Sequence, residues 1–204
     1  MEYSIDELII FSIIVSFLGF CLENIWLCMR KGYIDNRNMT FPFLIGYSFA
    51  MIGIYYLLGV PDAPSALVRF ITARFDYFSY YVTVFILVSI GEIILGKTVE
   101  RLCGIYYWDY TGLPLHITRY TSVLTSIGFS FIITKFMKCC FLTLMSVIAK
   151  LPRLLFSFGR MIYILMVCDF LNSFYKMYQT RQFNERWRKQ ICVTHKKLQK
   201  TNAL

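Results

Sequence analysis

Long apolar runs separated by short polar segments dominate the chain. Five runs stand out: Leu8–Met29, Phe41–Val60, Tyr80–Lys97, Tyr120–Met137 and Leu154–Phe174. An α-helix rises 1.5 Å per residue, so a run of about 20 residues crosses a hydrocarbon layer of about 30 Å with some tilt. The pattern predicts an all-α fold, a polytopic transmembrane helix bundle with about five membrane-spanning helices.

Two further segments are less regular. The stretch from Lys138 to Leu151 is apolar but bracketed by cations, so it either extends the fourth helix or lies in the membrane interface. Residues 1–175 are expected to form the transmembrane domain, and 176–204 a basic cytoplasmic tail. In the tail, Phe183, Trp187, Ile191 and Leu198 share one helical face among basic residues, which predicts an amphipathic helix resting on anionic lipid. Docking to a cytoplasmic partner is the alternative.

The composition agrees with a membrane protein and excludes several other classes. Of 204 residues, 57% are apolar and only 16% are charged, so the chain lacks the polar surface that a soluble enzyme needs. The net charge of +9 does not indicate a nucleic-acid partner, because the cations lie between apolar runs and in the tail. The partner expected from composition is membrane lipid.

The distribution of Lys and Arg predicts the orientation in the cell membrane. Outside the spans, one side carries six of these cations and the opposite side, which includes the tail, carries fourteen. The positive-inside bias places the N-terminus outside and the C-terminus in the cytoplasm. The first run follows Glu2, Asp6 and Glu7 rather than a basic segment, so we expect it to remain as a helix and not to act as a signal peptide.

The sequence offers few residues that could bind a metal or a cofactor. The chain holds two histidines, His116 and His195, and its seven cysteines form no CxxC pair, so we expect buried thiols, no metal site and no cofactor. A weaker alternative is that Glu92 and Glu100 form an acid and base pair, or hold a divalent cation together with Asp109.

Small residues predict how the helices meet, because helices in lipid approach one another through small side chains. Two stripes end in or contain acids: Ser12, Ser16, Gly19 and Glu23 in the first run, and Ser89, Glu92, Gly96 and Glu100 in the third. Two more lie in the second and fourth runs: Gly46, Ala50 and Gly53, then Ser122, Ser126 and Ser130. The acids are therefore expected to face protein rather than lipid.

Three acids are expected at one depth. Glu23, Glu92 and Asp169 each lie roughly 18 to 22 Å into a span that runs in the same direction. A bare charge at this depth costs several kcal/mol, so partners are required. The candidates are basic residues of the loops on that side: Arg37, Lys97, Arg101 and Arg119. Either a polar cavity open to the cytoplasm or a set of structural ion pairs satisfies this requirement.

Two loops on the same side are distinctive. One runs from Asp35 to Phe43, where Asn36 suits a turn and Arg37 offers a planar guanidinium group for a carboxylate or phosphate. The other carries Trp108, Asp109 and Tyr110 and leads to Arg119. Their aromatic rings suit headgroup depth, so an aromatic belt with a topology-setting arginine is the simpler interpretation.

Taken together, these features resemble a bacterial family of ABC-transporter permeases called type IV or CmpB-like. The resemblance covers roughly Gly19 to Ser173 and rests on these residues: Glu23, Asn36, Arg37, Pro42, Tyr47, Glu92, Glu100, Trp108, Asp109, Tyr110, Arg119 and Asp169. It implies a transport component. The chain has no GxxxxGK[ST] motif for ATP, so the resemblance implies a separate ATPase subunit.

The chain departs from that family at a few positions. Asn38 stands where the family usually has Gly, and Tyr107 replaces the first of two tryptophans. His116 and Thr118 replace an Asn and a Gly before Arg119. These departures indicate a divergent branch.

Three functions remain open at this point. The first is a transporter-type component in which a polar core near the cytoplasmic side binds or relays a cation, proton or cationic group. Its candidate residues are Glu23, Asn36, Arg37, Glu92, Glu100, Trp108, Asp109, Tyr110, Arg119 and Asp169. The second is an intramembrane enzyme acting on a lipid-linked or headgroup substrate, with Glu92 or Glu100 as the base and Arg37 or Arg119 holding phosphate. The third is a non-catalytic scaffold, in which the charges brace the bundle.

Overall fold

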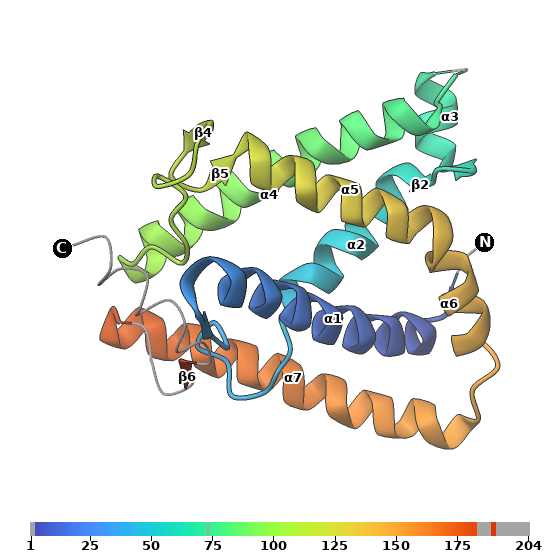
Figure 1. Cartoon of the computed structure of the whole chain (residues 1–204). Helices are drawn as coiled ribbons and strands as arrows, with labels where there is room; N and C mark the ends of the chain where they lie inside the picture. The colour runs from blue at the N-terminus through green and yellow to red at the C-terminus, as the bar shows by residue number, and fades with distance from the viewer. Residues whose placement is uncertain (1–2, 73, 183–188, 191–204) are drawn as a thin grey trace.

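Helices make up most of the structure (Figure 1). The computed structural model describes residues 3–72, 74–182 and 189–190. Its helices are α1 (Ile5–Lys31), α2 (Ile45–Leu58), α3 (Ala66–Ile71), α4 (Tyr77–Cys103), α5 (Val123–Cys139), α6 (Phe141–Ile148) and α7 (Arg153–Thr180). Short strands form antiparallel pairs: β1 (Tyr33–Ile34) with β6 (Lys189–Gln190), β2 (Gly59–Val60) with β3 (Ala63–Pro64), and β4 (His116–Thr118) with β5 (Thr121–Ser122). The prediction of a helical protein is confirmed.

Local capping residues determine where α1 and α4 begin and end. The Ser4 hydroxyl accepts from Glu7 N at the start of α1, and the Glu7 carboxylate accepts from Ser4 N at 2.7 Å. This reciprocal arrangement satisfies two backbone donors that the first turn leaves open. Asp76 caps α4 by accepting from Ser79 N at 2.8 Å. Both helices end at a left-handed glycine, Gly32 for α1 and Gly104 for α4.

Fewer helices are long enough to span a membrane than the sequence pattern predicts. Three helices of the described chain, α1, α4 and α7, are long and apolar enough to cross a membrane. A fourth span is present if α5 and α6, which meet at an angle of 53°, act as one broken span. α2 is apolar but has 14 residues, below the roughly 20 that a span usually needs. Five spans therefore remain a prediction.

α2 is short because the residues before it are held outside the helix. The backbone N–H groups of Thr40 and Phe41 bind Asp169 instead of a helical carbonyl. Pro42 has no N–H to donate, and Gly59 at the other end has a left-handed φ of 78°. The apolar run from Phe41 to Val60 thus contains a loop at one end and the strand β2 at the other.

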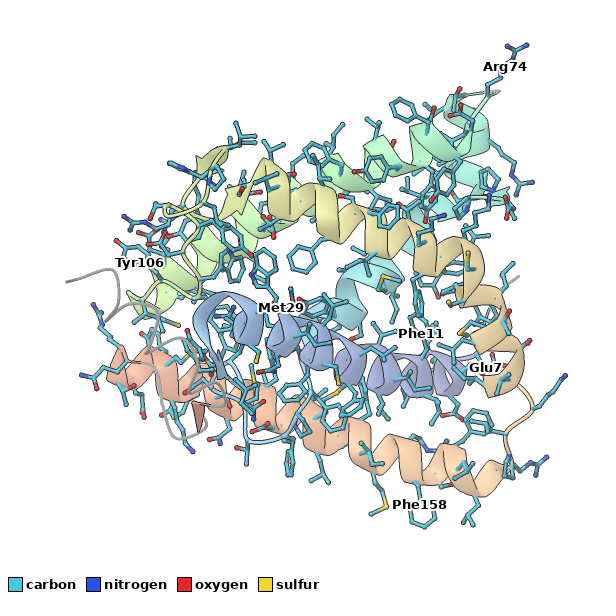
Figure 2. The ribbon with its side chains drawn as sticks, viewed as in Figure 1. Glu7, Phe11, Met29, Arg74, Tyr106 and Phe158 are labelled. Carbon is cyan, nitrogen blue, oxygen red and sulfur yellow. The ribbon has the colours of Figure 1, made fainter. Side chains whose placement is uncertain are left out.

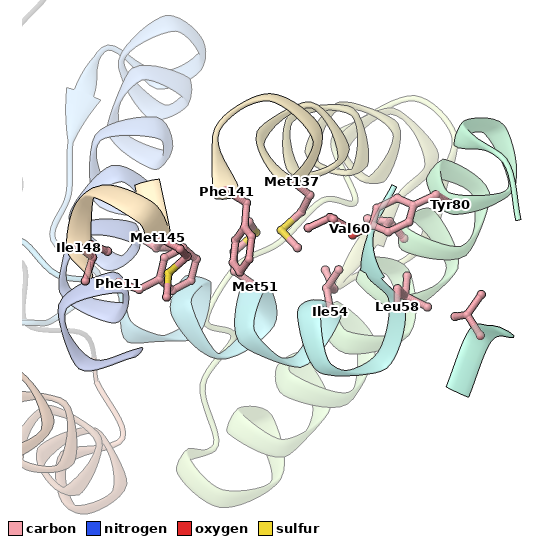
Figure 3. Packing of buried hydrophobic residues seen from close by; sticks show 13 residues of the cluster. Phe11, Met51, Ile54, Leu58, Val60, Tyr80, Met137, Phe141, Met145 and Ile148 are labelled. Carbon is pink, nitrogen blue, oxygen red and sulfur yellow. The ribbon is translucent and has the colours of Figure 1, made fainter. Parts of the chain in front are cut away.

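The helices pack as two pairs bridged by α2. α1 lies along α2 and α7, while α4 lies along α5 (Figure 1). Figure 3 shows the main core, where Phe141 of α6 meets Met51 of α2 and Met137 of α5. Phe11 of α1 and Tyr80 of α4 are fully buried in the same core.

Three of the four small-residue stripes have buried members, as the sequence predicts. Ser16 of α1 and Ser130 of α5 are fully buried, and in α4 Gly96 is buried. The stripe in α2 does not follow this rule, because Gly46 and Ala50 are exposed. α2 instead buries larger residues: Ile45, Ser48, Met51, Ile54 and Leu58.

Both distinctive loops lie at one end of the bundle. Figure 2 shows Met29, near the end of α1, and Tyr106, just after α4, at the same end, while Glu7 and Arg74 lie at the opposite end. Odd-numbered apolar runs therefore point the same way, as the sequence pattern requires. The loop that carries Arg37 and the loop that carries Trp108 share the end at which α7 terminates.

The structure describes the segment after α5 and the start of the tail. Residues 141–148 form α6, a separate helix that buries Phe141, Met145 and Ile148 against the core rather than extending α5 in a straight line. α7 continues past the expected domain boundary at residue 175 to Thr180. Most of the expected amphipathic tail helix lies outside the described residues. Lys189–Gln190, which is described, pairs with β1 as a strand.

Candidate functional site

A buried ion pair joins α1 to the loop that follows it. Nη2 of Arg37 binds Oε1 of Glu23, and the two side chains are only 15% and 10% exposed. The phenol of Tyr47, from α2, donates to the other carboxylate oxygen of Glu23 at 3.0 Å. Both oxygens of Glu23 are therefore occupied, which is the requirement for keeping a carboxylate away from water.

The loop around Arg37 is built to hold the guanidinium in place. Asp35 accepts from the backbone N–H of Arg37 at 3.1 Å, and Asn24 of α1 accepts from Asp35 N at 2.7 Å. Burial alone would lower the pKa of Arg37, but the charge of Glu23 and its hydrogen bond raise the pKa above the ordinary value. Arg37 thus remains a cation at any physiological pH.

A tight left-handed turn follows Asn36. Its side-chain amide donates to Met39 O, and Met39 N donates back to Asn36 O at 2.9 Å. Within this turn Arg37 and Asn38 have φ angles of 47° and 70°. Asn is the non-glycine residue that tolerates this region best, so Asn38 fits a position where the resembling family usually carries Gly.

Asp169 of α7 fastens the same loop from its other side. Its carboxylate accepts from Thr40 N at 2.8 Å and from Phe41 N at 2.9 Å. The side chain of Asn38 also donates to the Ser173 carbonyl of α7. Asp169 is 8% exposed, and its charge is met by backbone N–H groups rather than by an arginine. Asp169 therefore positions the loop that carries Arg37.

Glu92 of α4 has a different environment. Its Oε2 accepts from the Thr121 hydroxyl at 2.8 Å and from the Ser126 hydroxyl at 3.3 Å. These two hydroxyls also contact each other at 3.0 Å. Among the ion pairs of the described chain, none involves Glu92. The carboxyl group of Glu92 is thus surrounded by neutral donors.

Tyr110 links the two carboxyl groups electrostatically. Burial, followed by the charges of Glu92 and Glu23, raises the pKa of the Tyr110 phenol above its ordinary value, and Arg37 opposes this effect. The charges of Glu23 and Glu92 also act on each other. The phenol of Tyr110 therefore lies within electrostatic range of Glu23, Arg37 and Glu92.

Glu100, one turn before the end of α4, has a partner of its own. The phenol of Tyr120 donates to its Oε2 at 2.5 Å. The Tyr120 ring covers Gly96 so closely that a Cβ at this position would overlap the ring. The same arrangement occurs in α1, where the ring of Tyr47 covers Gly19 and its phenol binds Glu23.

The α1–α2 and α4–α5 hairpins thus use one device twice. In each, a glycine and a glutamate lie one helical turn apart, and a tyrosine from farther along the chain packs on the glycine and donates to the glutamate. Tyr47 lies in α2, and Tyr120 lies in the turn between β4 and β5. The difference lies in the cation, because Arg37 completes the first arrangement and no basic group pairs with Glu100 within the described chain.

The last group of predicted residues lies at the surface. Arg119 is 39% exposed at its side chain, pairs with Asp109 at 3.8 Å and lies 4.0 Å over the ring of Tyr106. Trp108 fastens this loop to the turn between β4 and β5 by donating from Nε1 to Tyr120 O at 2.8 Å. His116 is exposed. Asp109 and Arg119 are therefore apart from the buried pair of Glu23 and Arg37.

Metal-binding geometry is absent from the part of the chain that the structure describes. No three His, Cys, Asp or Glu side chains there are grouped so as to hold an ion. The carboxylates of Glu92, Glu100 and Asp109 each have a different neighbour, as described above.

Several contributing residues were outside the predicted set. Tyr47 carries part of the family resemblance but was not among the candidate site residues. Asn24, Tyr120, Thr121 and Ser126 were also missed. Asn24 and Ser126 lie inside apolar runs, where a polar side chain is itself a signal. Nothing in the sequence pairs Thr121 with Glu92, because 29 positions separate them.

A search of curated proteins and a search of solved structures each returned no match. A family model described as "Putative ABC-transporter type IV" matches residues 9–174, which include every residue of the buried cluster. The protein, with its apolar helices, belongs to this ABC-transporter-type membrane family.

Proposed function

We propose that this protein is the permease-like membrane component of a transporter that takes its energy from a separate ATPase subunit. It crosses the cell membrane five times, with its N-terminus outside and its C-terminus in the cytoplasm. Its transported substrate is a cation, a proton or a molecule with a cationic group. Residues 1–175 form the transport domain in this proposal, and the basic tail contacts anionic lipid.

The observation that carries the proposal is the buried pair of Glu23 and Arg37. Ionisable residues inside apolar helix bundles are costly, so they usually mark a pathway or site rather than a simple contact. Here the arginine comes from a loop rather than from a neighbouring helix. A loop can move away from a helix at lower cost than two packed helices can separate.

Movement of this loop would change which group neutralises Glu23. In one state Arg37 binds Glu23, and in the other state the substrate cation takes the place of the guanidinium. Asp169 and Tyr107 hold the loop in the first state. The position of the loop is therefore the element through which an ATPase subunit at the cytoplasmic end drives the cycle.

Copurification tests this function. A tagged full-length chain is extracted from the membranes of its own host with mild detergent, and the copurifying proteins are identified by mass spectrometry. We expect an ATP-binding subunit, whose ATPase rate falls in Arg37→Gln and stays at the wild-type rate in Arg160→Gln. Arg160 is the matched control, because it forms an exposed pair with Asp6 at the other end of the bundle. Isolation of the chain without an ATP-binding protein would contradict the proposal.

The geometry favours the lipid-enzyme alternative less. That function requires Arg37 or Arg119 to be available to hold a phosphate group. Arg37 is committed to Glu23 and to a backbone carbonyl of the second loop, while Arg119 lies over Tyr106 near Asp109. A phospholipid bound with its headgroup at both arginines would support the enzyme instead.

A further inference from the structure

Glu92 differs from the other two deeply placed acids in what meets its charge. Glu23 has the guanidinium of Arg37, and Asp169 has the backbone N–H groups of Thr40 and Phe41. Glu92 has two neutral hydroxyls and, within the described chain, no ion pair. An ionised carboxylate with no counter-charge inside an apolar bundle costs several kcal/mol. A neutral carboxyl group avoids that cost.

Counting hydrogens supports the neutral form independently. Glu92 Oε2, Thr121 Oγ1 and Ser126 Oγ form a triangle with edges of 2.8, 3.3 and 3.0 Å, all within hydrogen-bond distance. Three hydrogen bonds need three hydrogens, but each hydroxyl has only one to donate. With an ionised Glu92, one edge of the triangle has no hydrogen. A proton on Glu92 supplies the third: the O–H of Glu92 donates to one hydroxyl, that hydroxyl donates to the other, and the other donates back to Glu92.

The surroundings of Glu92 indicate what happens when this proton leaves. Glu23 of α1 and Tyr110 of the loop after α4 face Glu92 electrostatically, and Arg37 is bound to Glu23. β5 and α5 contribute the hydroxyls of Thr121 and Ser126. α2 places the phenol of Tyr47 on Glu23, not on Glu92. In α7, Asp169 is occupied by the loop.

Arg37 is therefore the cation whose contacts change when Glu92 loses its proton. An ionised Glu92 repels the carboxylate of Glu23, with which it interacts electrostatically. Release of the proton by Glu92 to water, which leaves a carboxylate, therefore weakens the contact between Arg37 and Glu23. Protonation of Glu92 restores this contact. The two acids have different roles, because Glu23 is held in an ion pair and Glu92 exchanges its proton.

We infer that Glu92 is an exchangeable proton-binding site, closed by the hydroxyls of Thr121 and Ser126 and coupled to the ion pair of Glu23 and Arg37. As a step in transport this inference rests on the proposed function. Protonation of Glu92 itself does not, because it follows from the contacts of the folded chain alone.

Infrared spectroscopy of the purified full-length chain in lipid nanodiscs tests the inference. A protonated carboxyl group gives a C=O stretching band that a carboxylate lacks, and the band shifts in D₂O when its proton exchanges with solvent. We expect such a band at neutral pH in the wild-type chain, its loss at alkaline pH and its absence in Glu92→Gln. Glu92→Asp should restore a band at a shifted position.

Glu100→Gln is the matched control, because Glu100 lies on the same helix and also binds a hydroxyl. This variant should keep the wild-type band. Size-exclusion profiles and circular dichroism confirm that each variant is folded before its spectrum is used. A wild-type chain without the band, or a band that survives unchanged in folded Glu92→Gln, would overturn the inference. Failure to copurify an ATPase would leave the band in place, so the two proposals fail separately.

Discussion

Arg37 and Tyr107 each bind the backbone carbonyl of the other. Nη1 of Arg37 donates to Tyr107 O at 3.2 Å, and the phenol of Tyr107 donates to Arg37 O at 3.2 Å, across 70 positions of sequence. Tyr107 is the residue that replaces a tryptophan of the resembling family, and its hydroxyl makes one of these two bonds. The reciprocal contact ties the loop after α1 to the loop after α4. Movement of one loop therefore requires the other to respond.

The buried ion pair should contribute far more to stability than the exposed one. Arg37→Gln leaves Glu23 buried without its cation and is expected to destabilise the chain by about 3 kcal/mol. Arg160→Gln breaks an exposed pair and should cost less than about 1 kcal/mol. Thermal unfolding in the same detergent measures both, and the double variant Glu23→Gln/Arg37→Gln should recover much of the first loss. Equal losses of stability in the two arginine variants would show that burial does not increase the contribution of the Glu23–Arg37 pair.

The close contacts of Tyr47 and Tyr120 predict which glycines cannot be enlarged. Gly19→Ala and Gly96→Ala place a Cβ into an aromatic ring, and each should destabilise the chain by about 1 to 3 kcal/mol. Gly128→Ala in α5 is the control, because nothing lies within 4 Å of a Cβ there. It should be neutral or stabilise by up to about 1 kcal/mol through helix propensity. If all three variants behave alike, the packing of tyrosine on glycine is not as described.

The left-handed turn predicts an order of tolerance at position 38. Asn38→Gly and Asn38→Ala both remove the hydrogen bond to Ser173, so their difference isolates the backbone effect. At a φ of 70° alanine should be less stable than glycine by about 1 kcal/mol or more. Melting temperatures of the two variants give the comparison, and an alanine variant as stable as the glycine variant would argue against this turn.

The cap of α4 predicts a pH dependence. Hydrogen bonds from Ser79 to the Asp76 carboxylate lower the pKa of Asp76 below its ordinary value of 3.8. A group whose pKa is lower in the folded chain contributes stability above its unfolded pKa and loses this contribution as pH falls through the folded pKa. The stability difference between wild type and Asp76→Ala should therefore be present at pH 7 and shrink below about pH 4. A difference that stays constant between these values would show that the charge of Asp76 is not what caps the helix.

The proposed orientation can be tested with reporter fusions. Alkaline phosphatase is active only outside the cytoplasm, so a fusion after Asp62, between α2 and α3, should be active. A fluorescent protein that matures only in the cytoplasm should be fluorescent when fused after Lys200. A phosphatase fused within the loop that carries Arg37 should be inactive, as should one fused at the C-terminus. The reverse pattern would invert the orientation and place the buried cluster near the outer face.

The positions of the longest helices, and the contacts of their acids with other parts of the protein, were predictable from the sequence. The apolar runs that contain Glu23, Glu92 and Asp169 correspond to α1, α4 and α7. This succeeds because transfer of a segment into lipid depends mainly on its own composition. Helix ends were less predictable. The first residues of the run from Phe41 to Val60 are not helical, because Asp169 binds the backbone there. The break between α5 and α6 falls at Cys140, where no proline or glycine indicates it in the sequence.

Partner choice among the polar residues was not predictable in the same way. Helical spacing placed Glu23 and Glu92 on protein-facing stripes, but it did not assign Arg37 to the first and two hydroxyls to the second. Nor did it show that Asp169 would bind backbone N–H groups 128 and 129 positions away. Such assignments depend on which loop reaches which helix.

Composition and periodicity alone therefore determined the membrane class, the main helices, the inward-facing acids and the family resemblance. Each of these follows from free energies that are local to one segment. The tertiary structure decided that Glu23 is paired, that Glu92 is not, and that Tyr47 and Tyr120 hold equivalent positions in two hairpins. The physical reason is that a buried charge is satisfied by whichever groups the packing of distant segments brings within about 3 Å, and no local pattern encodes that distance.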